Sequence, residues 1–387
     1  MLYIHIPYCN RKCLYCDFFS GGASVADWPR LRRALISELK MRHGELPEVI
    51  PSLYFGGGTP SLIPAEEFHS LMKGIRESLM AEGHRLADEC EVTLEANPED
   101  VDAERIKAWH ESGVNRLSLG VQTFSDELLR SIGRRHTGED AERALRILKS
   151  TFGNVSADLI FGLPGGSVAT LESDLDRLIG IAPHHVSVYT LMYEEDTALT
   201  ALRRAGRVEE VPDEEVERQY RRLTARLRES GYEHYEISNY AKPGYNSRHN
   251  TGYWLSRPYL GIGPAAHSYD GGYKRRANPA DLFGYLRHFA PEKRDATPRD
   301  AAAPFYQTET LTEAERLEER IMLRLRTSAG LDLAAFAADF GQESYRSLLC
   351  RARHHIESGR LQLRSGHLSL SEEGILTADA VIVDLLP

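Results

Sequence analysis

The sequence predicts an α/β protein whose mainly parallel sheet is followed by a smaller domain. Six short apolar runs, at residues 2–7, 52–56, 91–96, 116–121, 155–161 and 186–191, alternate with segments whose apolar residues recur every three or four positions, at residues 28–43, 64–81, 139–150 and 169–181. Strands that alternate with amphipathic helices form parallel sheets with right-handed crossovers. About six such units fit either an open doubly wound sheet or an incomplete (β/α) barrel, and periodicity does not separate the two.

The chain has 387 residues, which is longer than a chain that folds around a single hydrophobic core usually is. We therefore expect a large domain and a small one. We assign residues 1–240 to the core, 241–289 to a segment that extends it, 290–310 to a linker rich in Pro, Ala and Thr, and 311–387 to a C-terminal domain. In that domain, helical patterns at 313–327, 333–340 and 343–358 precede apolar runs at 360–363 and 367–370 and a last helix from Glu372. Helices followed by a hairpin outline a winged helix.

Charge and composition exclude several classes of partner. The net charge is −10, whereas nucleic acids and anionic membranes call for a basic surface. DNA binding is therefore disfavoured, although Arg351, Arg353, Arg360 and Arg364 lie in the winged-helix outline. No apolar run approaches the roughly 20 residues that span a bilayer, and the first residues show no targeting pattern. We expect a cytoplasmic protein without a transmembrane segment.

Three cysteines follow the first apolar run. Cys9, Cys13 and Cys16 have the spacing CxxxCxxC, which lets three thiolates converge on one iron–sulfur cluster. A four-iron cubane needs four ligands, so one iron stays open. A disulfide framework would need a denser set than five cysteines in this chain. A structural zinc site with His5 as fourth ligand stays an alternative, although the paired spacing of zinc ribbons is missing.

Polar and glycine residues stand where the predicted strands end. Ligands of parallel α/β proteins collect at the carboxyl ends of the strands. Glycines let the backbone approach a ligand, but tight turns also need them for steric reasons. A polar side chain buried in an apolar strand needs a partner, which is either a ligand or a neighbouring loop amide. The second run ends at Gly57, Gly58 and Thr59, and the next three hold Glu95, Gln122 and Asp158; Arg134 lies twelve residues beyond Gln122 and suits a carboxylate.

The cysteine spacing resembles the signature of radical S-adenosylmethionine (SAM) enzymes. With the segments Gly-Gly-Gly-Thr-Pro, Glu-Ala-Asn-Pro, Gly-Val-Gln and Asp-Leu-Ile-Phe-Gly-Leu-Pro in this order, about the first 270 residues resemble the oxygen-independent coproporphyrinogen III oxidase family. The resemblance implies a partial (β/α)6 barrel and a 4Fe-4S cluster on the three cysteines, with SAM on the fourth iron as the source of a deoxyadenosyl radical. It also implies SAM contacts at Tyr3, Gly57, Gly58, Thr59, Glu95, Gln122, Arg134 and Asp158.

Two departures favour a sister group within this family. The oxidases carry a further cysteine where this chain has Phe18, and a long extension where only eight residues precede Cys9. Both features resemble the HemW haem chaperones, which implies haem binding and delivery to acceptor proteins, membrane-associated respiratory enzymes among the candidates. The alternative is oxidative decarboxylation of coproporphyrinogen III to protoporphyrinogen IX. Whether the chain is an enzyme stays open, and a homodimer is one option for its assembly.

A second motif lies at residues 246–254, which we expect to form a turn-rich loop. Its HNxxYW segment offers an imidazole at His249 and flat rings at Tyr253 and Trp254, while Arg248 could meet a propionate. A histidine beside two aromatic rings is more often a packing corner than a ligand. The motif resembles the haem-associated motif of the chaperones, which implies that His249, Tyr253 and Trp254 contact haem. His267 is a second candidate ligand, for which a structural role is the simpler account.

Overall fold

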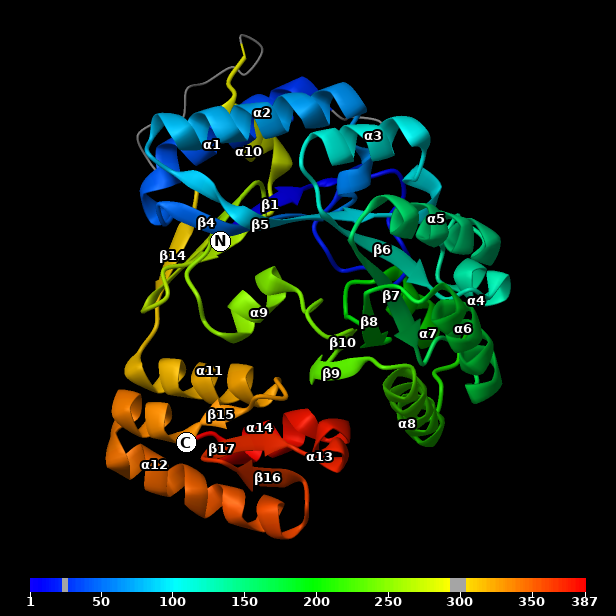
Figure 1. Cartoon of the computed structure of the whole chain (residues 1–387), viewed down its shortest axis with the longest axis vertical. Helices are drawn as coiled ribbons and strands as arrows, with labels where there is room; N and C mark the ends of the chain where they lie inside the picture. The colour runs from blue at the N-terminus through cyan, green and yellow to red at the C-terminus, as the bar shows by residue number, and fades with distance from the viewer. Residues whose placement is uncertain (23–26, 293–303) are drawn as a thin grey trace.

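The computed structural model describes residues 1–22, 27–292 and 304–387. In Figure 1 a large α/β core lies above a smaller domain that contains the C-terminus, and helix α9 lies between them. Most of the predicted linker at residues 290–310 falls outside the described residues. None of the helices in the described segments combines the length and the apolar character needed to cross a bilayer.

One sheet of nine strands forms the core. Its order is β11-β1-β4-β5-β6-β7-β8-β10-β9, and the strands from β11 to β8 are parallel. The sequential order from β1 to β8 has no reversal point, which is the winding of a barrel rather than of a doubly wound sheet. The two edge strands do not pair, so the predicted partial barrel is confirmed. The strands are β1 (Leu2–Ile6), β4 (Val49–Gly57), β5 (Arg85–Ala96), β6 (Arg116–Gln122), β7 (Asn154–Phe161), β8 (His185–Thr190), β9 (Glu233–Glu236), β10 (Asn239–Ala241) and β11 (Leu260–Ile262).

Helices cover the outer face of this sheet (Figure 1). The four predicted helices are present as α1 (Trp28–Arg42), α2 (Ala65–Ala81), α5 (Gly138–Thr151) and α6 (Val168–Ile181). Helix α5 begins where Thr137 and Asp140 form a capping box, which satisfies two backbone amides at the helix start. Helices that the sequence analysis left out are α3 (Ala103–Glu111), α4 (Asp126–Ser131), α7 (Ala198–Arg204), α8 (Asp213–Glu229) and α10 (Leu282–Phe289).

The segment after residue 240 adds to the core. Strand β11 pairs in parallel with β1, and a small sheet is formed by β12 (His267–Tyr269), β13 (Lys274–Ala277) and β14 (Gln307–Thr310), the last within the predicted linker. The expected loop at 246–254 is wrong, because Arg248–Trp254 forms helix α9. The Ser247 side chain caps this helix, and the Glu91 carboxylate accepts from two of its first amides.

The C-terminal domain has its own core and the predicted winged-helix outline. It consists of α11 (Glu313–Leu325), β15 (Leu331–Asp332), α12 (Leu333–Glu357), β16 (Leu361–Arg364), β17 (His367–Leu370), α13 (Glu372–Leu376) and α14 (Ala378–Leu385). The two predicted helices at 333–340 and 343–358 are both present within α12, where Gly341, with φ 83° and ψ 167°, interrupts the helical backbone between them. Backbone hydrogen bonds join the domain to the core, among them those from Ile237 N to Arg326 O and from Ser328 N to Tyr235 O.

Candidate cluster and SAM site

The three cysteines lie on the loop that follows β1, at the carboxyl ends of the parallel strands. Cys9 belongs to the two-residue strand β2 (Tyr8–Cys9), which pairs with β3 (Gly21–Gly22). The middle of the loop is fixed by Leu14, whose amide donates to Ile132 O at 3.1 Å and whose carbonyl accepts from Leu199 N at 2.8 Å. All three sulfurs are half-buried. The fold therefore holds the loop against the mouth of the barrel and leaves the thiols within reach of a cofactor.

Polar groups that follow β4 and α4 approach two of these thiols. Thr59 Oγ1 lies 3.2 Å from Cys9 Sγ, and Arg134 Nη1 lies 3.5 Å from Cys13 Sγ. Burial, together with the charge of the other two thiols, raises the pKa of Cys16 to about 11. A bound metal cation reverses this preference, because it favours the thiolate.

The spacing of the sulfurs distinguishes a cluster from a single ion. Within residues 1–22, 27–292 and 304–387, only His354, His355 and Asp384 bring three metal-ligating atoms within 4.8 Å of one another. The three cysteine sulfurs are therefore spread more widely than one zinc ion with bonds of about 2.3 Å would hold them. A cubane fits this spread, because each cysteine binds a different iron. His5 does not complete a zinc site, since its ring nitrogens lie 3.2 Å from Tyr3 OH and 3.0 Å from Phe19 O.

The glycine turn after β4 packs directly under the cysteine loop. Gly58 N donates to Ile6 O at 2.7 Å, and a Cβ at Gly58 would lie 2.7 Å from Tyr8 O. Gly57 has φ +108°, and a Cβ there would lie 2.6 Å from the His5 ring. Steric fit within the protein therefore requires both glycines, whatever backbone contacts they make to a ligand.

Glu95 lies in the barrel interior beside two tyrosines. Tyr54 OH donates to Glu95 Oε1 at 2.7 Å, and the Tyr54 ring stacks on the Tyr3 ring with 6.0 Å between centroids. Burial raises the pKa of Glu95 to about 7, and the nearby Asp158 raises it as well. A cationic or hydrogen-donating ligand at this position would be stabilised by the carboxylate.

Asp158 lies on β7, next to Glu95. The Ser118 hydroxyl lies 3.0 Å from each oxygen of this carboxylate, and Ser156 Oγ donates to it at 3.2 Å. Burial raises the pKa of Asp158, whereas its hydroxyl partners and the Arg116 guanidinium oppose the shift. The predicted strand-end residues Glu95 and Asp158 thus share one polar interior.

Gln122 and Arg134 meet on the cluster side of the same interior. Arg134 Nη2 donates to Asn97 Oδ1 and to Gly120 O, both at 2.7 Å. A Cβ on Gly120 would lie 2.8 Å from Gln122 Nε2 and 3.1 Å from Arg134 Nη2, so these side chains converge at this glycine. Arg134 Nε is buried without a hydrogen-bond partner among the described residues. This orphan donor fits a SAM carboxylate beside the cluster.

The HNxxYW motif lies lower in the barrel than the cysteine loop. His249 is 1% exposed, and its ring packs 5.0 Å from Tyr54, which precedes the glycine turn on β4. Its Nδ1 lies 2.9 Å from Ser52 Oγ and its Nε2 lies 2.9 Å from Tyr253 OH. The structure therefore groups His249 with Tyr253 and away from the three cysteines, and both ring nitrogens are engaged in this conformation.

The other candidate haem residues point in different directions. The Trp254 ring lies 6.0 Å from Arg326 Cζ of the C-terminal domain, while Arg248 lies 3.8 Å from Glu89 on the surface. His267 is exposed, on the face of β12 opposite to Ser268, which accepts from a guanidinium of α1. The residues predicted for haem thus do not form one closed pocket.

Two interior residues were missed by the sequence analysis. Tyr54 stands two residues before the glycine turn, on the same face of its strand as Ser52, and the alternation of polar and apolar residues there was the available signal. Arg116 is 1% exposed, and its Nε has no hydrogen-bond partner among the described residues. Because Arg116 is the first residue of an apolar run, the sequence favoured an exposed side chain at the start of a strand. In the structure it is the cation that faces Glu95 and Asp158.

Comparison with known families matches both domains. Residues 3–178 match the model of the radical SAM superfamily, and residues 311–377 match that of the HemN C-terminal domain. Among solved structures, coproporphyrinogen III oxidase (HemN) from Escherichia coli, a radical SAM enzyme, aligns with a TM-score of 0.82 over 100% of this chain and 89% of that chain. Its sequence identity is 19%, so this likeness shows the fold.

Curated relatives are similar over nearly the whole chain. The heme chaperone HemW of Bacillus subtilis is 34% identical over 387 residues, which cover 98% of this chain and 97% of the relative. The heme chaperone HemW of Escherichia coli is 35% identical and covers 82% of this chain and 84% of the relative. A mitochondrial protein of Bos taurus, radical S-adenosyl methionine domain-containing protein 1, is 33% identical over 100% of this chain and 87% of the relative.

Proposed function

Since the chain belongs to the HemW family of radical SAM proteins, we propose that it is a haem chaperone, which binds haem and passes it to acceptor proteins. The observation that carries the proposal is the 34% identity to a heme chaperone HemW over almost the full length of both chains. The 4Fe-4S cluster and SAM follow from the radical SAM family. Cytoplasmic location, respiratory enzymes as acceptors and a homodimer stay predictions.

Cys9, Cys13 and Cys16 are the proposed cluster ligands, with SAM on the fourth iron. When reduced, such a cluster supplies the electron that cleaves SAM. Arg134, beside Cys13, would hold the SAM carboxylate, while Glu95 in the interior would accept hydrogen bonds from the other end of the ligand. We propose further SAM contacts in the same part of the barrel, at Tyr3, Gly57, Gly58, Thr59, Gln122 and Asp158. Thr93, Arg116 and Arg134 each have a buried polar atom without a hydrogen-bond partner in the described part of the chain, which supports a polar ligand there.

His249 is the proposed axial ligand of haem, with Tyr253 and Trp254 beside the porphyrin. Burial lowers the pKa of His249 to about 3, so the imidazole is neutral at physiological pH and protons do not compete with iron. Tyr253 OH lies 2.9 Å from His249 Nε2. Haem iron can bind this nitrogen only if the tyrosine side chain rotates away.

The decisive test is a haem titration of cluster-loaded protein, followed at the Soret band with and without SAM. His249→Ala should abolish or strongly weaken haem binding while the cluster absorbance survives. His69→Ala is the matched control, because His69 is exposed on α2. His267→Ala tests the second candidate ligand. Unchanged haem binding in His249→Ala would remove the axial-ligand assignment, and absence of haem binding by the unmodified protein would refute the chaperone.

A separate test addresses the oxidase alternative. Phe18, where the resemblance implies a cysteine in the oxidases, is 62% exposed beside the cluster loop and has no sulfur. We expect that anaerobic incubation with coproporphyrinogen III, SAM and reductant gives no vinyl product. Conversion to protoporphyrinogen IX would overturn the chaperone proposal.

A further inference from the structure

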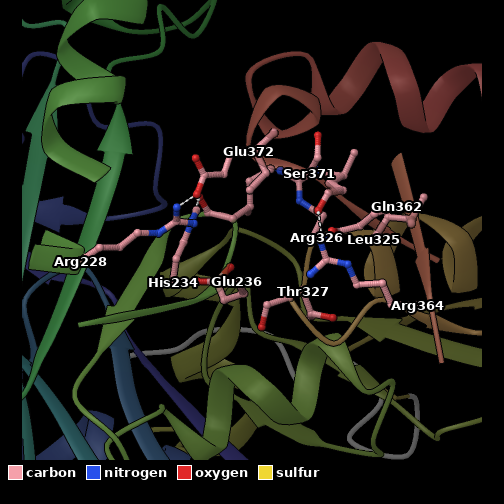
Figure 2. Close-up of a pocket in the computed structure, with 14 residues that line it drawn as sticks. Arg228, His234, Glu236, Leu325, Arg326, Thr327, Gln362, Arg364, Ser371 and Glu372 are labelled. Atoms are coloured by element: carbon pink, nitrogen blue, oxygen red, sulfur yellow. Dashed lines mark hydrogen bonds and ion pairs between the residues drawn. The ribbon is translucent and has the colours of Figure 1, made fainter. Parts of the chain in front are cut away.

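A pocket of about 410 Å³ lies where the core meets the C-terminal domain. Figure 2 shows the ion pair between Arg228 and Glu372 on one side of the pocket. Gln362 and Arg364 lie on the other side. The pocket is close to the HNxxYW helix, because Arg326 lines it and lies 6.0 Å from the Trp254 ring. Its volume is within the range of small-molecule sites, which is roughly 300 to 1,000 Å³. None of the residues proposed above to bind the cluster or SAM lines it.

The pocket holds surplus positive charge in a chain of net charge −10. Of its three arginines, Arg228 is neutralised by an ion pair with Glu372. Among the described residues Arg326 has one ion pair, which is loose, at 3.4 Å from Asp379, whose side chain is 85% exposed. Arg364 is exposed, and its guanidinium makes no ion pair or hydrogen bond within the described residues, since its residue pairs with β17 through the backbone alone. Two guanidinium groups are therefore available to an anion that carries two carboxylates.

Two residues that line the pocket each have one buried polar atom without a hydrogen-bond partner among the described residues, Nε of Arg326 and Oε1 of Glu236. Glu236 is 2% exposed, and burial raises its pKa to about 7. With this pKa part of the carboxyl is protonated near neutral pH, and the protonated form donates a hydrogen bond to an anion instead of repelling it. Buried orphan donors are costly, so a ligand that accepts from them gains affinity.

Four apolar side chains also line the pocket, beside polar ones such as Thr327, Gln362 and Ser371. Ile237, Leu325, Leu370 and Ile375 line the pocket with the charged groups. An inorganic anion would leave these walls uncovered, whereas a flat hydrophobic molecule with two carboxylates at one edge would use both kinds of surface. Arg324 Nη2 donates to Leu255 O at 3.2 Å, so the helix that carries Trp254 is fixed to the same domain.

We propose that this pocket binds the two propionate carboxylates of haem, with Arg326 and Arg364 as their partners and the porphyrin edge against the apolar wall. This inference rests on the proposed haem-chaperone function and deepens it, because it gives the C-terminal domain a part in haem binding. It assigns the propionates to Arg326 and Arg364 instead of Arg248, which lies beside Glu89.

The test compares haemin with haemin dimethyl ester, which has the same ring and iron but no carboxylates. The full chain, loaded with its cluster, is titrated with each compound. We expect haemin to bind at least tenfold more tightly than the diester. Arg364→Gln should lose about tenfold in haemin affinity and leave diester affinity unchanged, since a charge-assisted hydrogen bond contributes this order of magnitude. Arg326→Gln should behave alike.

Arg353→Gln is the matched control, because Arg353 is exposed in the same domain and does not line the pocket. It should bind both compounds like the unmodified protein. Equal affinity of the unmodified chain for haemin and diester would overturn the propionate pocket and leave the chaperone function standing. The propionate pocket would also be overturned if Arg364→Gln kept full affinity for both compounds, or if it lost affinity for haemin and for the diester equally. Absence of binding to either compound would refute the chaperone function itself.

Discussion

Removal of one hydroxyl from the HNxxYW motif tests whether His249 ligates haem. Tyr253→Phe keeps the ring, which packs edge-on against His249 at 4.9 Å and against Tyr259 at 4.7 Å, and deletes the group that lies 2.9 Å from His249 Nε2. If iron binds Nε2, it must displace this hydrogen bond, whose net contribution is about 0.5–1.5 kcal/mol. We therefore expect haem to bind the variant roughly fivefold more tightly.

The same change should destabilise the haem-free protein. It leaves Nε2 buried without a partner, which costs about 1–3 kcal/mol. Haem restores a partner, so the increase in melting temperature on haem addition should be larger for Tyr253→Phe than for the unmodified chain. Soret titration and thermal unfolding with and without haem measure both effects. A variant that loses haem affinity as His249→Ala does, or whose affinity is unchanged, would show that iron does not replace the tyrosine at Nε2.

Three further expectations concern the cluster and the barrel interior. Cys16→Ala should prevent reconstitution of iron and acid-labile sulfide, whereas Cys350→Ala, in the C-terminal domain, should retain both; equal loss would remove the ligand assignment. Burial raises the pKa of Glu95 from 4.5 to about 7, so its contribution to stability is present below pH 4.5 and is lost as the pH rises through 7. Urea unfolding of cluster-free protein at pH 5 and pH 8 should show a difference that Glu95→Gln reduces by up to about 3 kcal/mol, and an unaltered difference would contradict the shift. Arg134→Lys should weaken SAM binding about tenfold by calorimetry with cluster content retained, because lysine does not reproduce the two-nitrogen contact to Cys13 and Asn97; full SAM affinity would exclude that role.

Local sequence patterns were enough for the strands and helices that the analysis named. Residues 116–121 and 155–161 became β6 and β7, and the helical pattern at 139–150 became α5, because side-chain periodicity sets which face each element buries. The rule that ligands collect at strand ends also placed Glu95 and Asp158 in one interior. Motif order gave the family, and with it the choice of a barrel that periodicity left open.

The loop expected at 246–254 failed for a tertiary reason. Helix α9 is stabilised by the Glu91 carboxylate, which lies more than 150 residues earlier in the chain and accepts from the amides of Arg248 and His249. No pattern within the motif itself contains that interaction. The same packing buries His249 between Ser52 and Tyr253, so the availability of its nitrogens is a property of the fold and not of the motif.

The sequence by itself determined six strands and four helices of the core, the three cysteines on one loop and the family, because each depends on residues close together in the chain or on motifs in a fixed order. Only the tertiary structure decided which distant side chains share a space. It brought Arg116 to face Glu95 and Asp158, and it placed Arg326 and Arg364 across a pocket from Glu236. The physical reason is that burial, pairing and pKa depend on neighbours that chain crossovers and domain docking supply, and a linear pattern does not record them.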